Sequence, residues 1–182
     1  MILVTDRRGR FEAIAAEVFE PLQRYLRRRV PTEDAADILA EVLLTMWRRV
    51  EDVPEDRPLP WCYGVARRTL ANHRRSQYRH LRLVQRLERE APIPAPDPAD
   101  SVGDPEVAQA LARLSASDQE ILRLWAWEQL EPREIAEVLG STPNAVSLRL
   151  SRAKRKLAAS LRRQSPASAG QEEDRETEVH DD

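Results

Sequence analysis

The residues with the clearest chemistry are cations gathered in two stretches that contain no carboxylate. Residues 61–80 contain five arginines, and residues 143–163 contain five arginines and two lysines. A guanidinium can bind a phosphate through two parallel hydrogen bonds, so a face with cations alone suits a nucleic-acid backbone. The formal net charge of −2 conceals both faces, because residues 33–56 and 165–182 are acidic. Charge is therefore sorted along the chain, and phosphate binding is the chemistry this pattern predicts.

The second basic stretch has the helix start and stop signals of a helix-turn-helix. A short helix over 133–139 precedes Gly140, and Thr142 with Pro143 opens a longer helix. The buried stripe expected on that helix consists of Val146, Leu150, Ala153 and Leu157. The residues expected to meet bases and phosphates are Asn144, Ser147, Leu148, Arg149, Ser151, Arg152 and Arg155. A helical hairpin with a solvated basic face is the alternative.

The first basic stretch sets aromatic and amide side chains among its arginines. Opening a duplex costs roughly 1–2 kcal/mol per base step in lost stacking. A protein offsets that cost by holding an unstacked base in a pocket and the single strand on a basic groove. The residues expected to do this, with the loop 52–60, are Trp61, Tyr63, Arg67, Arg68, Asn72, Arg74 and Arg75. Ordinary core packing is the alternative for Trp61 and Tyr63.

Helices must position both stretches. Apolar residues recur at three- and four-residue spacing, no segment alternates as a strand would, and glycine is scarce. The pattern predicts a helix over 11–30 that ends before Pro31, a helix over 32–50 capped by Thr32, and a third that begins near Leu59. Further along, it predicts helices over 106–114, over 118–127 with Ser117 and Glu120 in a capping box, and on either side of Gly140.

The predicted fold is all-α, with two small helical domains joined by a proline-rich linker. The segments are a three-helix domain over 8–90, a linker over 91–105, a helix-turn-helix domain over 106–163 and an acidic disordered tail over 164–182. The linker can stretch to at most roughly 45 Å. The tail either stays free or lies on the basic face of the second domain.

These motifs resemble the extracytoplasmic-function (ECF) subfamily of bacterial RNA polymerase sigma factors. Residues 111–157, which include Glu134-Ile135-Ala136-Glu137-Val138-Leu139-Gly140, resemble region 4, the reader of the −35 promoter element. Residues 59–75 resemble regions 2.3 and 2.4, which melt and read the −10 element; at Gly64 the family often has a bulky or basic residue. Residues 37–47 resemble the region 2.2 helix that grips the polymerase clamp. The core-polymerase contacts implied by that likeness are Asp37, Glu41, Leu44 and Trp47.

The resemblance implies a transcription initiation factor and no enzyme. Core RNA polymerase, promoter DNA and an anti-sigma factor are the implied partners, and no cofactor is expected. Nucleotide-binding loops and hydrolase motifs are absent, and Cys62 with His73, His80 and His180 makes no metal-ligand pattern. We expect a cytoplasmic protein without membrane insertion. The competing interpretation is an autonomous helix-turn-helix regulator that binds duplex DNA as a dimer.

Overall fold

The computed structural model describes residues 2–87 and 104–164, and within these ranges every regular element is a helix. The helices are α1 (Ile2–Arg27), α2 (Thr32–Arg48), the short 3-10 helix η1 (Val50–Asp52), α3 (Pro58–Leu87), α4 (Pro105–Ala112), α5 (Ala116–Ala126), α6 (Pro132–Leu139) and α7 (Pro143–Gln164). The predicted all-α fold is confirmed. Nearly all of the predicted linker and of the predicted tail lies outside the described residues, and Gln164, the predicted first residue of the tail, is the last residue of α7.

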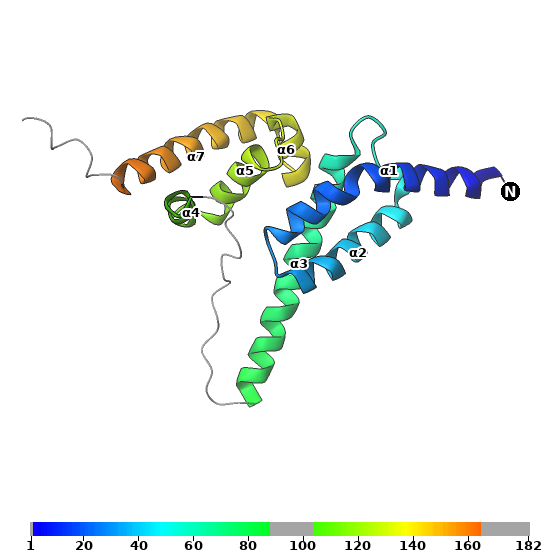
Figure 1. Cartoon of the computed structure of the whole chain (residues 1–182), viewed down its shortest axis with the longest axis horizontal. Helices are drawn as coiled ribbons and strands as arrows, with labels where there is room; N and C mark the ends of the chain where they lie inside the picture. The colour runs from blue at the N-terminus through cyan, green and yellow to red at the C-terminus, as the bar shows by residue number, and fades with distance from the viewer. Residues whose placement is uncertain (1, 88–103, 165–182) are drawn as a thin grey trace, which may run out of the picture.

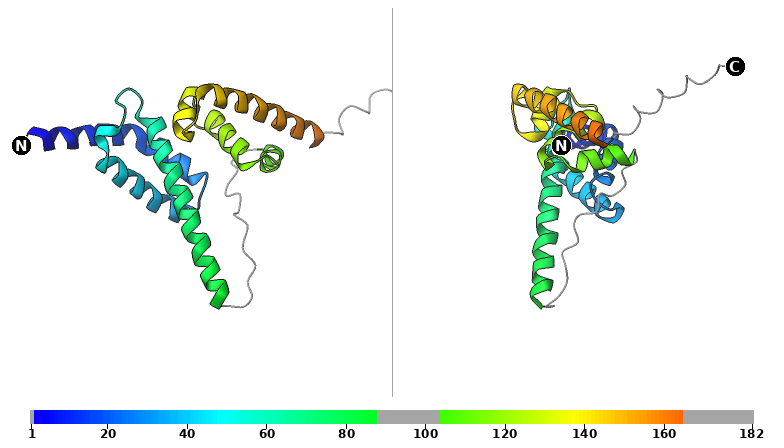
Figure 2. Two further views of the ribbon diagram at one scale, coloured as in Figure 1. Left: turned by 180° about the vertical axis from the view of Figure 1, so that it is seen from behind. Right: turned by 90° about the vertical axis from the view of Figure 1, so that its left-hand side faces the viewer.

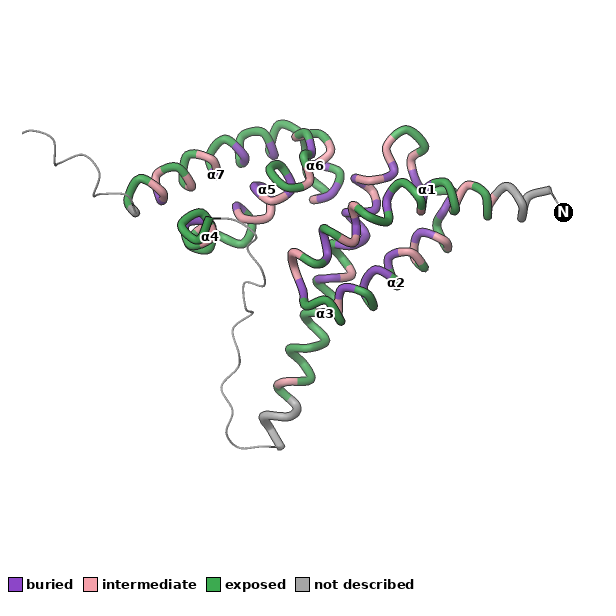
Figure 3. Tube along the Cα trace, in the orientation of Figure 1, coloured by how far each residue is buried: buried purple, intermediate pink, exposed green. Residues whose placement is uncertain are grey.

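The first domain consists of α1, α2 and α3, each packed against the other two (Figure 1). Its core is formed by apolar side chains at helical spacing, among them Val18, Leu22, Ile38, Val42, Met46, Ala66 and Leu70. Beyond Leu70, α3 runs away from both neighbouring helices, and residues 71–82 are almost all exposed (Figure 3). This part of α3 is therefore a solvated helix that carries cations.

The start of α1 precedes the apolar pattern that predicted it. The expectation placed this helix from Phe11, whereas it begins at Ile2. Two arginines tie its first turns to the end of α2 and to the residue that follows η1. Arg7 Nη2 donates to the carbonyl oxygen of Trp47 at 2.8 Å, and Arg10 Nη2 donates to that of Val53 at 2.8 Å. Polar contacts hold this extension, which is why hydrophobic periodicity did not indicate it.

The second domain consists of α4 to α7, with α4, α5 and α6 all packed against α7. Gly140 ends α6 in the left-handed conformation, at φ 63°, as expected. Thr142 Oγ1 accepts from the Ala145 amide at 3.3 Å and caps α7. The short α6, the turn at Gly140 and the long α7 make the predicted helix-turn-helix.

Two predicted helix caps were wrong. Thr32 is the first residue of α2, and Pro31 stands at the cap position without a side-chain hydrogen bond. Ser115, not Ser117, caps α5, because its hydroxyl accepts from the Asp118 amide at 3.2 Å. The segment contains two serines two residues apart, and the local pattern does not distinguish them.

The two domains lie against each other through α3 and α6, and the views in Figure 2 agree on this. Their buried apolar residues form one continuous cluster. Gly64 on α3 lies in this contact, since a Cβ built there would be 3.7 Å from the Val138 Cα. Buried Gly64, the departure from the family pattern, thus lies beneath the backbone of α6.

Candidate nucleic-acid and polymerase interfaces

The outward face of α7 is open to solvent, as a recognition helix requires. Every residue expected there is exposed: Asn144, Ser147, Leu148, Arg149, Ser151, Arg152 and Arg155. Val146, Leu150 and Ala153 are buried against the rest of the domain, and Leu157 packs beside them half-buried. Leu148 exposes 51% of its surface, so its side chain is accessible from outside the domain. An exposed apolar side chain here is suited to the methyl group of thymine.

Several polar groups of α7 are already engaged within the domain. Arg149 donates to the Ser117 hydroxyl, Lys156 pairs with Asp118 at 2.7 Å, and Lys154 lies 3.3 Å from the ring centre of Trp125. The Ser147 hydroxyl donates to the Pro143 carbonyl at 2.9 Å. Among the described residues, Arg152 and Arg155 form no ion pair, so these two cations can turn to DNA without breaking one.

The Asp118–Lys156 pair fixes the orientation of α5 against α7. The hydrogen bond from Lys156 is the main cause that holds the pKa of Asp118 below its ordinary value. The carboxylate is nearly buried, whereas Lys156 exposes 59% of its side chain. This contact positions the recognition helix and leaves its outward face untouched.

The basic face of α3 is exposed over most of its length. Arg67, Arg68, Asn72, Arg74 and Arg75 are all exposed. Asn72 accepts from Arg75 Nη2 at 2.6 Å, and Arg74 Nη2 donates to the Arg29 carbonyl at 3.3 Å. Arg67 and Arg68 form no ion pair among the described residues, so a phosphate would find them unoccupied.

The two aromatic residues expected in a base pocket do not lie together. Trp61 is half-buried and lines a shallow depression with Arg49, Gly64, Arg68 and Glu137. Tyr63 is 2% exposed, and its ring centre lies 4.9 Å from that of Tyr25. Burial raises the pKa of Tyr63, and neighbouring Glu128 raises it further. In this arrangement only Trp61 is accessible, and Tyr63 has the surroundings of a core residue.

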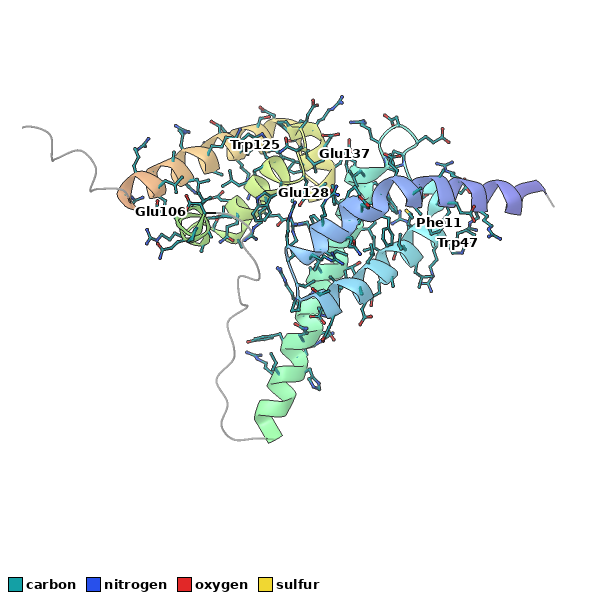
Figure 4. All side chains as sticks on the ribbon, viewed as in Figure 1. Phe11, Trp47, Glu106, Trp125, Glu128 and Glu137 are labelled. Atoms are coloured by element: carbon teal, nitrogen blue, oxygen red, sulfur yellow. The ribbon has the colours of Figure 1, made fainter. Side chains whose placement is uncertain are left out.

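The residues expected to contact polymerase follow one face of α2. Asp37, Glu41 and Leu44 are exposed at helical spacing, and Leu44 exposes 46% of its surface. Trp47 is half-buried, with its ring 5.3 Å from that of Phe11 in an edge-to-face contact (Figure 4). The face combines two carboxylates with apolar surface, a composition found at protein interfaces.

Sequence reasoning missed a set of charged residues between the domains. Arg28 and Arg29, at the end of α1, meet Glu120 and Glu128 of the second domain. Roughly a hundred residues separate the partners, with a sequence separation of 99 between Arg29 and Glu128. No local pattern indicates a pairing over that distance. The one available signal was the run of arginines at 27–29, whose role the sequence leaves open.

The described residues contain no cluster of histidine, cysteine and acidic side chains able to hold a metal ion. His73 lies 3.3 Å from Asp34 and 2.9 Å from Gln77. Cys62 is fully buried, 3.8 Å from the Met46 sulfur, and burial raises the pKa of its thiol to about 12. No helix in the described part of the chain has the length and apolar character to cross a bilayer.

Comparison with known proteins gives matches to both domains. Residues 16–80 match the family model for sigma-70 region 2, and residues 105–157 match that for sigma-70 region 4, so together they take in well over half of the chain. The RNA polymerase sigma factor NccH of Alcaligenes xylosoxydans xylosoxydans is 28% identical over 166 residues, which cover 87% of this chain and 84% of NccH. The sigma factor CnrH of Cupriavidus metallidurans is 27% identical over 148 residues, covering 72% and 75% of the two chains.

Solved structures share the fold. CnrH in complex with the cytosolic domain of CnrY superposes with a TM-score of 0.58 at 24% identity, covering 85% of this chain and 89% of CnrH. The sigma factor RpoE of Bartonella quintana, in complex with the anti-sigma factor NepR, superposes with a TM-score of 0.61 at 19% identity, covering 84% and 96%. Both likenesses extend over the two helical domains.

Proposed function

We propose how this chain, which belongs to the ECF subfamily of bacterial RNA polymerase sigma factors, divides promoter recognition between its two domains. The first domain, over 8–90, binds core polymerase and the −10 element. The second domain, over 106–163, reads the −35 element. Matches to both sigma-70 regions set aside the autonomous dimeric regulator, which would need only the helix-turn-helix.

The observation that carries this proposal is the outward face of α7. It combines exposed Leu148 and Ser151 with two cations that form no ion pair in the described chain, Arg152 and Arg155. In a major groove, Arg152 would donate to guanine and Leu148 would contact a thymine methyl. Arg149 and Arg155 would meet phosphates on either side, after Arg149 leaves the Ser117 hydroxyl.

For the −10 element, the proposal rests on the exposed cations of α3 and the accessible edge of Trp61. Arg67, Arg68, Arg74 and Arg75 would hold the single strand. Trp61 and Asn72 would contact an unstacked base, together with the loop 52–60. Tyr63 would take part only where the second domain has moved off α3, because its ring is buried in the closed arrangement.

For core polymerase, the proposal rests on the α2 face of Asp37, Glu41 and Leu44. Leu44 is an exposed apolar side chain beside carboxylates, and a charge placed on a residue that binding buries should cost about 2 kcal/mol or more. Trp47 packs on Phe11, so it would support this face as well as contact the clamp. Leu44→Arg should therefore weaken core binding by about thirtyfold.

The proposal also covers the binding partners of the protein and its location in the cell. The chain would supply no catalytic step, since polymerase performs the chemistry, and it would act in the cytoplasm beside the polymerase. CnrH and RpoE are solved in complexes with CnrY and NepR, the second named as an anti-sigma factor. We therefore propose that an anti-sigma factor also controls this chain.

Run-off transcription with bacterial core polymerase on a genomic promoter library tests the proposal. Specific starts should appear only when the protein is added, and their shared upstream sequences should contain a −10 and a −35 element. Leu44→Arg should abolish these starts while the protein alone keeps its helical content. A protein that shifts duplex DNA as a dimer and produces no start would contradict the proposal.

A further inference from the structure

The first turns of α1 lie beside the face of α2 that is proposed to bind polymerase. α1 begins at Ile2, whereas the residues that match sigma-70 region 2 begin at 16. Figure 4 labels Phe11 and Trp47 next to each other, where these turns meet the end of α2. Trp47 is one of the four residues expected to contact polymerase, so the start of α1 adjoins a candidate binding residue.

The Trp47 ring is contacted by two side chains of α1. The guanidinium carbon of Arg7 lies over the ring, 5.3 Å from its centre. The Phe11 ring meets it edge-on, with ring centres 5.3 Å apart and planes at 86°. Arg7 and Phe11 are four residues apart and therefore share one face of α1. Cation–π and edge-to-face contacts both depend on ring orientation, so together they restrict the orientation of the Trp47 indole.

Hydrogen bonds to α2 hold the Arg7 guanidinium over that ring. Its Nη2 donates to the carbonyl oxygen of Trp47 at 2.8 Å and to that of Arg48 at 3.2 Å. The last carbonyl groups of a helix have no partner within the helix, and the helix dipole favours a cation beside them. The Nε atom of Arg7 is inaccessible to solvent. Arg7 is therefore bound to the end of α2 by its charged group, which fixes its position over the indole.

The neighbouring arginines of α1 make different contacts. Arg8 is exposed, and among the described residues its one ion pair joins Glu12 of the same helix, at 2.7 Å. Arg10 holds the start of α1 to the segment after α2, because its Nη2 donates to the Val53 carbonyl at 2.8 Å. Of these three arginines, Arg7 is the one that contacts Trp47 in the described part of the chain.

The four residues expected on the polymerase face differ in burial. Asp37, Glu41 and Leu44 are exposed, whereas Trp47 is half-buried. A side chain that rotates freely before binding loses this freedom at an interface, and the loss weakens binding. A ring that is already held has little such freedom to lose. The contacts from α1 therefore fix the orientation of Trp47 before polymerase binds.

We propose that Arg7 is a positioning residue for polymerase binding, which acts by holding the Trp47 indole in its binding orientation. This inference rests on the proposed contact between α2 and core polymerase. The effect of Arg7 passes through Trp47, because the guanidinium is bound to the end of α2 and lies over the ring. The basic faces of α3 and α7 play no part in it, so DNA contacts do not depend on Arg7.

Competition with a wild-type chain labelled at its C-terminus measures how full-length variants bind core polymerase. Arg7→Ala should weaken this binding about threefold to tenfold, the cost of ordering one side chain at an interface. Arg8→Ala is the matched control, because it removes the same charge one residue further along α1, and it should change binding by less than about twofold. Arg7→Lys keeps the charge but lacks the planar fork, so its affinity should fall between those of Arg7→Ala and the wild type.

A double-mutant cycle with Trp47→Leu separates positioning from direct contact. In the Trp47→Leu chain, Arg7→Ala should weaken polymerase binding by less than about twofold, since no indole is left to hold. An undiminished loss in that chain would overturn the inference, because Arg7 would then contact polymerase itself.

Two further measurements separate this role from a general loss of structure and from a failure of the polymerase face. Binding of a fluorescein-labelled oligothymidine should be the same for Arg7→Ala and the wild type. An equal loss of oligothymidine and polymerase binding would overturn the inference, since Arg7 would then support the whole domain. Unchanged polymerase binding by Arg7→Ala would also overturn it. In that case Leu44→Arg identifies what has failed: weaker binding by Leu44→Arg leaves the α2 face in place and removes only the role of Arg7, whereas unchanged binding removes the proposed face as well.

Discussion

The basic helices α3 and α7 carry similar side chains but are held in place differently. α7 buries Val146, Leu150 and Ala153 within its own domain and leaves its outward face exposed. α3 is covered at its start by its own domain and also by α6 of the other. Tyr63, 2% exposed, therefore depends on both domains for its burial, whereas Leu148 remains 51% exposed.

This difference separates a surface that stays exposed in any arrangement of the domains from one whose exposure depends on that arrangement. The exposure of Leu148 should not change if the domains move apart, because α7 packs against helices of its own domain. The exposure of Tyr63 does change, because Glu128 and α6 form part of its surroundings. We infer that the α7 face is accessible in any arrangement of the domains, whereas Tyr63 on α3 becomes accessible only when the domains separate.

Tyr63→Ala and Leu148→Ala test this comparison most strongly. Removing the buried ring of Tyr63 should lower the free energy of unfolding by about 3–5 kcal/mol, as aromatic-to-alanine changes in cores do. Leu148→Ala should change it by less than about 0.5 kcal/mol. Urea denaturation followed by circular dichroism measures both.

Tyr63→Phe is the control, because it keeps the ring and removes only the hydroxyl near Glu128. It should cost about 1 kcal/mol or less. Similar losses for Tyr63→Ala and Leu148→Ala would mean that the two helices are not held differently.

Helix periodicity predicted the fold to the extent that each domain buries its own residues. The α7 stripe is an example, since spacing alone assigned Val146, Leu150 and Ala153 to the core. Tyr63 shows the limit. Its burial against Tyr25, and its contact with Glu128 from the other domain, depend on tertiary packing that no local window contains.

Arg152→Ala should have the next largest effect, on DNA binding alone. Loss of a bidentate contact to guanine should weaken holoenzyme binding to the cognate −35 element by about 1–3 kcal/mol and relax the choice of base at one position. Arg163→Ala, on the last turn of the same helix, is the control and should cost less. Fluorescence anisotropy on labelled promoter duplexes measures both. Equal losses on all sequences would assign Arg152 to a phosphate.

The sequence predicted which residues carry the chemistry of the candidate site, but not which of their side chains are already engaged in contacts within the domain. Sequence placed the candidate arginines of α3 and α7 on outward faces, and these arginines are all exposed. It did not indicate that Arg149 donates to Ser117 or that Lys156 pairs with Asp118. Those partners lie on α5, thirty or more residues away, so spacing within α7 carries no information about them.

Arg67→Ala sharpens the comparison by salt dependence. Removing an exposed cation that contacts a phosphate of a single strand makes the dependence of affinity on salt less steep. The slope of log affinity against log salt should become less negative by about 0.7. The effect should appear in oligothymidine binding by the full-length chain, because Arg67 is already exposed. Arg113→Ala on the second domain should leave that slope unchanged. An equal decrease for both would mean that charge alone, and not the face of α3, governs the interaction.

The smallest expected effect concerns how α7 is held within its own domain, through Asp118 and Lys156. The folded pKa of Asp118 lies below the unfolded value of about 3.9, so the pair stabilises the fold at pH values above that and loses its contribution as pH falls through the folded pKa. Because Lys156 is largely exposed, the contribution should be no more than about 1 kcal/mol. The difference in unfolding free energy between the wild type and Asp118→Asn should therefore be constant from about pH 5 to 7 and shrink towards zero in more acid solution. Groups that titrate in both proteins cancel in this difference, including those between the domains. A difference that persists at acid pH would mean that Asp118 positions α7 by shape and not by charge, and that the recognition helix, unlike the contact between the domains, does not depend on an ion pair.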